Sequence, residues 1–279
     1  MFTTDAVSTR KNSTQIWCPM DTERNYRSIQ PNGDTNYLPT DISYKFNSCG
    51  FRCDEFTDEA DIRILFMGCS FTEGIGLPLE DIWTTLFLNK IKSLPQNIGK
   101  KIPYWTIAAG GTGIDFTARV LCNYIDTIKP THIIYMMGST HRREYCLNSL
   151  TLSYWIPMPN KYNAKIVDPL FADEFYSYHQ SIRSAQLINF AANTSQSKVY
   201  VFDISADDDD YLGGKIFEPF QNITYNRINP NDYTDIPLEF AYIMNKPRSA
   251  RDSSHPGALW QYSAYMRIWG VVKGEFNPK

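Results

Sequence analysis

Short apolar runs alternate with helix-like patterns from residue 61 to the end of the chain, and most of the runs stop at a glycine. Runs with the length and composition of buried strands lie at 63–68, 104–109, 131–137 and 198–204. Helical spacing of apolar residues lies between and after them, at 78–94, 114–128, 174–194 and from Pro256 through Trp269. Strand, glycine loop and helix in repetition indicate parallel βαβ units. We therefore predict an α/β fold: a three-layer α/β/α sandwich with a mostly parallel, flavodoxin-like sheet of about five strands.

The first 60 residues differ from the rest, because they are polar and have no apolar periodicity for a core of their own. We predict that residues 1–60 form an extended N-terminal arm, with short strands at most, that packs on a domain of residues 61–279. The arm ends in a compact turn, in which Gly50 is expected to take a positive φ. Inserts near 145–173 and 205–250 interrupt the alternation, and connections of that length are uncommon unless they are functional.

The composition and net charge limit the classes of partner that this protein is expected to bind. Lys and Arg number 27 against 30 Asp and Glu, a net charge of -3, so no basic surplus indicates nucleic acid. The first residues lack the run of roughly 7–15 apolar residues of a signal peptide, and no run reaches the about 18 of a transmembrane helix. Six cysteines without a CxxC pair indicate reduced thiols. We predict a cytoplasmic protein with no nucleic-acid or membrane partner, and the oligomeric state stays open.

Two of the loops after predicted strands carry residues suited to acyl chemistry. Ser70 follows a buried strand and precedes a helix, where free N–H groups and the helix dipole favour an oxyanion. Its surroundings are not GxSxG, so the nucleophile elbow of α/β-hydrolases does not apply. The loop Gly110–Gly113 lets backbone N–H groups approach a substrate closely, as an oxyanion hole needs. Alone, that loop is equally compatible with phosphate binding.

A third loop, directly before the last helix, contains Asp252 and His255. A carboxylate three residues before a histidine can place an oxygen on the imidazole Nδ1, which leaves Nε2 free to take a proton from a serine. The chain has only four histidines, so the position of this one is informative.

Together these segments resemble, in order and over roughly residues 45–270, the SGNH or GDSL-like hydrolase family. Gly68–Thr72 is similar to the Gly-Asp-Ser block, with Cys69 where Asp is usual, and Ala109–Thr112 is similar to the second block. Asp252 and His255 match the final Asp-x-x-His block. The turn Asn47–Arg52 also resembles a segment that precedes the first block in such proteins. Similar forms occur among phage-encoded members, which leaves a viral source and a virion-associated location open.

The resemblance implies a function and a set of roles. Ser70 would be the nucleophile, His255 the general base and Asp252 its orienting carboxylate, with the Ser70 and Gly111 N–H groups on the oxyanion. The third block departs from the family, because Thr140 stands where an Asn donates to the oxyanion. Losing one oxyanion donor costs about 3 kcal/mol, so turnover is expected to be slow unless Thr140, His141 or Arg142 substitutes for it.

We thus predict a serine esterase that works through an acyl-enzyme, without a cofactor or metal, on a small-molecule or glycan ester. Aromatic residues of the inserts favour O-acetyl groups on a saccharide, with a lipid-like acyl chain as second choice; they are Tyr154, Trp155, Phe171, Phe175 and Tyr176. Two alternatives stay open. One is acyl transfer at the same site, and the other is a decayed glycan-binding or virion-associated structural module, favoured by the changes at Thr140 and Cys69.

Several further residues have a second interpretation. Cys69 could be a nucleophile, although it fills the position at which the family's side chain points away from the substrate. Arg142 and Arg143 are either surface charges with Glu144 or an anion-binding feature at the rim of the site. A calcium site at Asp207–Asp210 and a metal site with His141 and Cys146 lack the remaining ligands.

Overall fold

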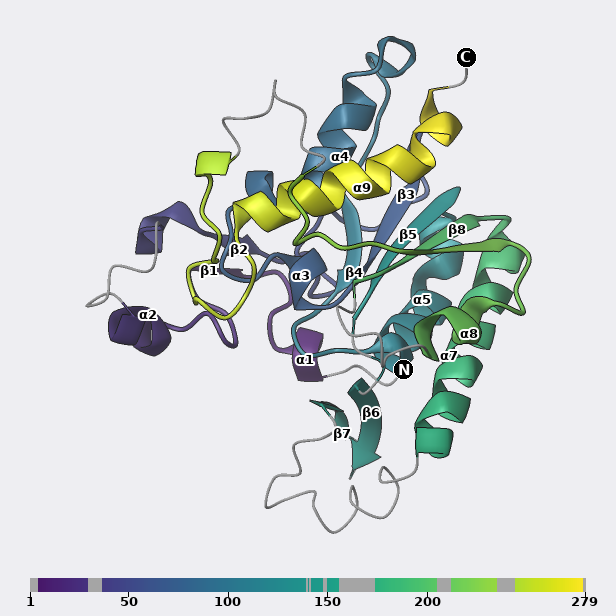
Figure 1. Cartoon of the computed structure of the whole chain (residues 1–279), viewed down its shortest axis with the longest axis horizontal. Coiled ribbons are helices and arrows are strands. Elements are labelled where there is room, and N and C mark those ends of the chain that lie inside the picture. Colours follow the sequence, from purple (N-terminus) through teal and green to yellow (C-terminus); the bar gives the residue numbers. More distant parts are fainter. Residues whose placement is uncertain are drawn as a thin grey trace.

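A five-stranded parallel sheet runs through the centre of the molecule (Figure 1). The computed structural model describes residues 5–29, 37–138, 140, 142–147, 150–155, 174–204, 212–234 and 244–277. The strands of the sheet are β3 (Ile64–Gly68), β4 (Trp105–Ala108), β5 (His132–Met137), β8 (Lys198–Asp203) and β9 (Ile223–Arg227). Their order is β4-β3-β5-β8-β9, and every neighbouring pair is parallel. This is the flavodoxin-like order 2-1-3-4-5, so the predicted fold is confirmed.

Helices cover both faces of the sheet (Figure 1). Alternate residues of each strand point to opposite faces. On one face Phe66, Ile134 and Phe202 pack with α4 (Trp83–Lys92) and α9 (Ala258–Phe276). On the other face the intervening residues pack with α5 (Ile114–Ile128) and α7 (Glu174–Ser195); they are Leu65, Met67, Ile133, Tyr135, Val199 and Val201. Two apolar layers therefore enclose the sheet, and β3, β4, β5 and β8 are largely apolar runs because both of their faces are buried.

Helix α5 begins and ends where the sequence predicts, whereas α4 and α9 differ from their predicted bounds. Helix α5 has the predicted bounds, with Gly113 as its N-cap and Lys129 in the left-handed region after it. The helix predicted from residue 78 begins only at Trp83, because Ile82 is extended. A short 3-10 turn, η3 (Leu79–Asp81), precedes it. Helix α9 extends past Trp269 to Phe276.

The two predicted inserts contain regular structure that the sequence pattern did not indicate. Helix α8 (Leu212–Phe217) and strand β9 lie inside 205–250, so the insert supplies the fifth strand. Only Ile223 of β9 is buried, which leaves this edge strand without a continuous apolar run. Strands β6 (Arg142–Leu147) and β7 (Leu150–Trp155) form an antiparallel hairpin at the start of the other insert. Asp207–Asp210 lie outside the described residues.

The N-terminal segment contains more helix than predicted. Its elements are α1 (Asp5–Ser8), β1 (Thr14–Gln15), α2 (Glu23–Ile29), η2 (Pro39–Asp41) and β2 (Tyr44–Lys45), with β1 and β2 antiparallel. Helix α2 buries no residue, so it has no apolar face for a periodicity to reveal. By contrast Tyr37, Ile42, Tyr44 and Phe46 are buried in the same apolar layer as α4 and α9. The domain division at residue 60 stays a prediction.

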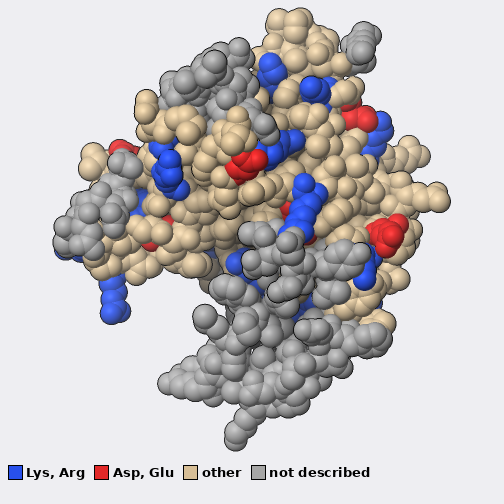
Figure 2. Space-filling view, viewed as in Figure 1, with Lys and Arg blue, Asp and Glu red and all other residues tan. Residues whose placement is uncertain are grey.

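On the face drawn in Figure 2, the described surface shows no charge pattern on which to place a partner. Lys and Arg lie scattered among Asp and Glu over the described surface of the face in Figure 2. Among the described helices, none has the length and apolarity that crossing a bilayer requires. The predicted location in the cytoplasm and the predicted absence of nucleic-acid binding stay predictions.

Candidate active site

Ser70 begins a sharp turn at the carboxyl end of β3, the strand beside the point where the strand order reverses. It is the first residue of α3 (Ser70–Glu73) and is 2% exposed. A Cβ on Gly68 would lie 2.0 Å from Thr72 Oγ1, so the chain can fold back this tightly only over a glycine. In open α/β sheets, ligands bind beside such a reversal at the carboxyl ends of the strands.

The glycine loop after β4 lies beside Ser70. A Cβ built on Gly110 would be 3.9 Å from the Ser70 Cβ. The Gly110 N–H donates to Glu73, and the Thr112 N–H donates to the Ala109 carbonyl. Within the described residues the N–H groups of Gly111 and Ser70 make no hydrogen bond, and Gly111 has φ +78. These two neighbouring donors are those that the sequence pointed to for an oxyanion.

Asp252 and His255 form a buried hydrogen-bonded pair. His255 Nδ1 lies 2.5 Å from Asp252 Oδ2, and the two side chains are 6% and 0% exposed. The second carboxylate oxygen accepts the backbone N–H groups of Ser254 and His255, at 3.2 and 3.1 Å. An imidazole that donates from Nδ1 to a carboxylate presents its Nε2 lone pair as a proton acceptor. The loop thus holds a histidine in the tautomer that a general base needs.

The loop that carries this pair is closed at its base. Ser249 and Pro256 form an antiparallel bridge, and the Ala250 N–H donates to the His255 carbonyl at 2.9 Å. Ser253, at the tip, has φ 54. On the far side the Arg251 N–H donates to the Gly76 carbonyl at 2.8 Å. The pair is therefore held by backbone on both sides.

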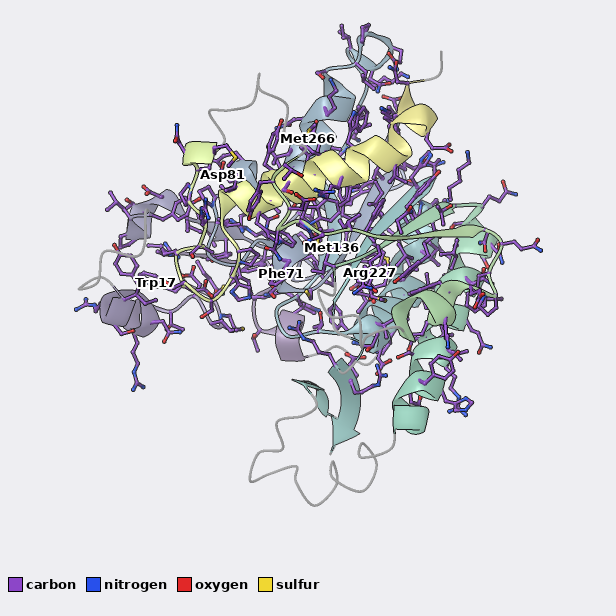
Figure 3. All side chains as sticks on the ribbon, in the orientation of Figure 1. Trp17, Phe71, Asp81, Met136, Arg227 and Met266 are labelled. Carbon is purple, nitrogen blue, oxygen red and sulfur yellow. The ribbon has the colours of Figure 1, made fainter. Side chains whose placement is uncertain are left out.

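Phe71 brings the serine turn and the histidine loop together. Its ring lies edge-on to the His255 imidazole with centroids 5.9 Å apart, and edge-on to Trp260 at 5.2 Å. Its carbonyl accepts a hydrogen bond from Gln261 of α9 at 3.2 Å. Figure 3 places Phe71 at the centre of the molecule. Since Phe71 follows Ser70 directly, its ring brings the serine turn into contact with the histidine loop.

Ser70 and His255 are not hydrogen-bonded to each other in the described part of the chain. The Ser70 hydroxyl instead donates to Cys69 Sγ at 4.0 Å. In the absence of substrate such hydrogen bonds are often long and tighten only when the substrate is bound.

The residues after β5 lie at the same edge of the sheet. Thr140 is 5% exposed, whereas Ser139 and His141 lie outside the described residues. Arg142 Nη1 approaches the Thr112 carbonyl at 3.5 Å, so the start of β6 borders the glycine loop. The role of Arg142 as an anion-binding feature at the rim of the site stays a prediction. Within the described ranges, no three His, Cys, Asp or Glu side chains gather closely enough to hold a metal ion.

One interpretation of the sequence made Arg142 and Arg143 surface charges that pair with Glu144. The structure gives Arg143 and Glu144 other partners. Arg143 is 2% exposed and donates to Ser181 Oγ at 2.6 Å, because β6 packs its side chain against α7. Glu144 pairs with Arg119 of α5 at 2.7 Å. The side chains of Cys146 and of the five aromatic residues expected in the substrate cleft lie outside those that the structure describes.

Sequence reasoning missed several buried charges around the site. Arg251, next to Asp252, forms an ion pair with Asp21 at 2.6 Å, and both side chains are 0% exposed. Glu73, three residues after Ser70, forms an ion pair with Arg10 at 2.5 Å, and the side chains are 1% and 7% exposed. A charged residue beside a motif is by default a surface residue, so the sequence carried no signal for these pairs.

Comparisons with known proteins find matches among solved structures alone. No family model matches the chain, and no curated protein matches it. Among solved structures, TesA matches 75% of this chain and 97% of its own, with 12% identity and a TM-score of 0.47. An acetyl xylan esterase, AlAXEase, matches 76% and 100%, with 14% identity and a TM-score of 0.46. A GDSL-like lipase from Bacteroides thetaiotaomicron matches 90% and 98%, with 12% identity and a TM-score of 0.41.

Proposed function

We propose that this protein is a serine esterase of the SGNH type, with Ser70, His255 and Asp252 as its catalytic residues. The observation that carries the proposal is the buried Asp252–His255 hydrogen bond, on a loop whose imidazole packs against the residue after Ser70. Burying the imidazole of His255 and the carboxylate of Asp252 is costly unless the two groups are paired with each other. The pairing found here leaves Nε2 as the acceptor that acyl transfer requires.

The mechanism follows from these positions. Ser70 Oγ attacks the ester carbonyl carbon while its proton passes to His255 Nε2, and Asp252 stabilises the imidazolium. The Ser70 and Gly111 N–H groups, together with the Thr140 hydroxyl, hold the oxyanion. The bond to the alcohol then breaks, and the alcohol leaves with the proton from His255. Water attacks the acyl-enzyme with His255 again as base, which releases the acid and restores Ser70.

The burial around the nucleophile favours a short acyl group. Ser70, Thr140 and His255 are 2%, 5% and 7% exposed, so little of the reacting groups is accessible from solvent. We therefore propose an acetyl ester as the substrate. The saccharide part of the proposal depends on aromatic residues of 145–173, because aromatic rings stack on the apolar faces of sugars.

Hydrolysis of 4-nitrophenyl acetate tests the assignment. We expect Ser70→Ala and His255→Ala each to lower kcat by at least about 10³-fold. Cys69→Ala, the control for the alternative nucleophile, should keep most of the turnover. Loss of activity in Cys69→Ala with activity kept in Ser70→Ala would overturn the assignment.

Two further measurements separate this function from its alternatives. A fluorophosphonate probe should label the wild type and not Ser70→Ala; no labelling over a range of pH, with retained glycan binding, would favour a decayed binding module. Acetylated polysaccharide should release free acetate. An acyl-sugar product in place of acetate would instead favour acyl transfer.

A further inference from the structure

Glu73 joins the turn of the nucleophile to the glycine loop. It is the last residue of α3, and its carboxylate is buried. Oε2 accepts a hydrogen bond from the Gly110 N–H at 2.6 Å, and Oε1 accepts one from Arg10 Nη1 at 2.5 Å. A Cβ on Gly110 would lie 3.6 Å from Glu73 Oε2 and 3.9 Å from the Ser70 Cβ. One carboxylate thus lies between the serine turn and the loop that supplies the proposed oxyanion donor.

The hydrogen bond to Glu73 determines which glycine can serve the oxyanion. The Gly110 N–H is directed at a carboxylate, so it is not available to a substrate. Its neighbour Gly111 takes φ +78 and keeps an N–H that no described residue accepts. An amide held by a charged acceptor is fixed more firmly than one held by a neutral acceptor, because such hydrogen bonds are about twice as strong. The orientation of the Gly111 peptide therefore depends on the acceptor at Glu73.

The charge of Glu73 would oppose catalysis if nothing balanced it. A negative tetrahedral intermediate on Ser70 would form close to a buried carboxylate, where the low dielectric strengthens repulsion. Arg10 supplies the balancing charge. Its Nε donates to the Gly50 carbonyl at 2.9 Å, and its guanidinium lies 4.5 Å from the Phe46 ring centroid. The cation is thus delivered by the N-terminal segment, which no part of the mechanism has used so far.

We propose that Glu73 is a positioning residue that orients the Gly110–Gly111 peptide toward the oxyanion, and that Arg10 neutralises it. The inference rests on the proposed esterase function. It also gives the N-terminal segment a role in the rate of acyl transfer in addition to its packing on the sheet.

Four variants separate orientation from charge. Glu73→Ala removes the acceptor, whereas Glu73→Gln keeps an oxygen for the Gly110 N–H and removes the charge. Arg10→Met leaves the carboxylate unbalanced. The double variant Arg10→Met/Glu73→Gln keeps the acceptor and removes both charges. The pair Arg119→Met/Glu144→Gln, between α5 and β6, is a matched control because it removes a partly buried ion pair outside the site.

For 4-nitrophenyl acetate, we expect Glu73→Ala to lower kcat on the order of 10²-fold, the effect of misplacing one oxyanion donor, with KM changed less than about twofold. Arg10→Met should lower kcat on the order of tenfold through repulsion. The double variant should recover most of the loss of Arg10→Met. The Arg119/Glu144 control should lower the melting temperature without changing kcat per folded molecule.

Amide hydrogen exchange of the 109–113 segment gives a readout that does not depend on activity. Exchange at Gly110 should accelerate in Glu73→Ala and stay slow in Glu73→Gln. Activity of Glu73→Ala within about threefold of the wild type, or no rescue by the double variant, would overturn the inference while leaving the esterase proposal intact. If the wild type neither hydrolyses esters nor reacts with the fluorophosphonate, the esterase proposal fails. The proposed effect of Glu73 on the rate of acyl transfer then fails as well. Unchanged exchange in Glu73→Ala would overturn the positioning role in either case.

Discussion

Replacing Asp21 by alanine removes the carboxylate that balances a fully buried arginine. Asp21 accepts hydrogen bonds from Arg251 Nε at 3.0 Å and Nη2 at 2.6 Å, and both side chains are 0% exposed. It also accepts the Tyr44 hydroxyl. Burial raises the pKa of Tyr44 far above its ordinary value, so Tyr44 remains a neutral donor at any pH of interest. The variant would leave an uncompensated positive charge in the interior.

The expected cost follows from this geometry. Breaking a buried ion pair by removing one partner costs about 3–5 kcal/mol. Arg251 keeps the Pro39 and Ile16 carbonyls and stays 4.2 Å from the Trp17 ring centroid, which places the estimate near the lower end. About 3 kcal/mol corresponds to a fall in melting temperature on the order of 10 °C for a chain of this size.

Glu23→Ala is the matched control, two residues along the same segment. The Glu23–Arg27 pair is exposed, with side chains 53% and 76% accessible, so its loss should cost under about 0.5 kcal/mol. Both variants are to be compared by thermal and urea unfolding. The double variant Asp21→Asn/Arg251→Met, which leaves no charge unpaired, should be more stable than Asp21→Ala. An Asp21→Ala melting temperature equal to that of Glu23→Ala would refute the reasoning.

Three further outcomes are expected. Gly76→Ala should lower the free energy of unfolding by about 2–4 kcal/mol, because φ is +74 and the new Cβ would lie 2.8 Å from the Ala250 Cβ. Gly99→Ala is the control: Gly99 has φ +81 but open space around it, so the variant should cost only about 1 kcal/mol. Urea titration measures both. Burial lowers the pKa of His132 below 6.5, so the unfolded chain binds its proton first and stability is lost as the pH falls below 6.5. His132→Phe should therefore reduce the difference in urea midpoint between about pH 7.5 and about pH 5.5, and an unchanged difference would contradict this. Burial raises the pKa of the Cys53 thiol to about 12, so alkylation at neutral pH, followed by mass spectrometry of peptides, should be much slower at Cys53 than at the exposed Cys122.

The central elements could be predicted because each has a strong local cause. The strands β3, β4, β5 and β8 are buried on both faces, so they are continuous apolar runs that stand out from the flanking sequence. Helix α5 has an apolar stripe and a glycine before its first residue. The edge strand β9 and helix α2 lack such a cause, because only Ile223 of β9 is buried and α2 buries no residue. The hairpin β6–β7 forms by pairing of its two strands with each other, outside the central sheet.

The order of elements also placed the candidate site. Parallel strands bring their carboxyl ends to one edge, so Ser70, Gly111 and Thr140 had to lie near one another once their strands were identified. The spacing of Asp252 and His255 determined their mutual contact, since three residues of a closed loop leave the carboxylate within reach of the imidazole. These parts of the site were local in sequence or followed from topology.

What the sequence could not determine is which charges are buried. Asp21 and Arg251 are 230 residues apart, and Arg10 and Glu73 are 63 apart, so no local pattern links them. A charge is expected at the surface until a partner of opposite sign meets it inside. By itself the sequence determined strands β3, β4, β5 and β8, the helices that cover them and the residues that suit acyl transfer. Only the tertiary structure decided that the N-terminal segment supplies the counter-charges behind both the serine turn and the histidine loop, because that pairing arises when distant segments pack together.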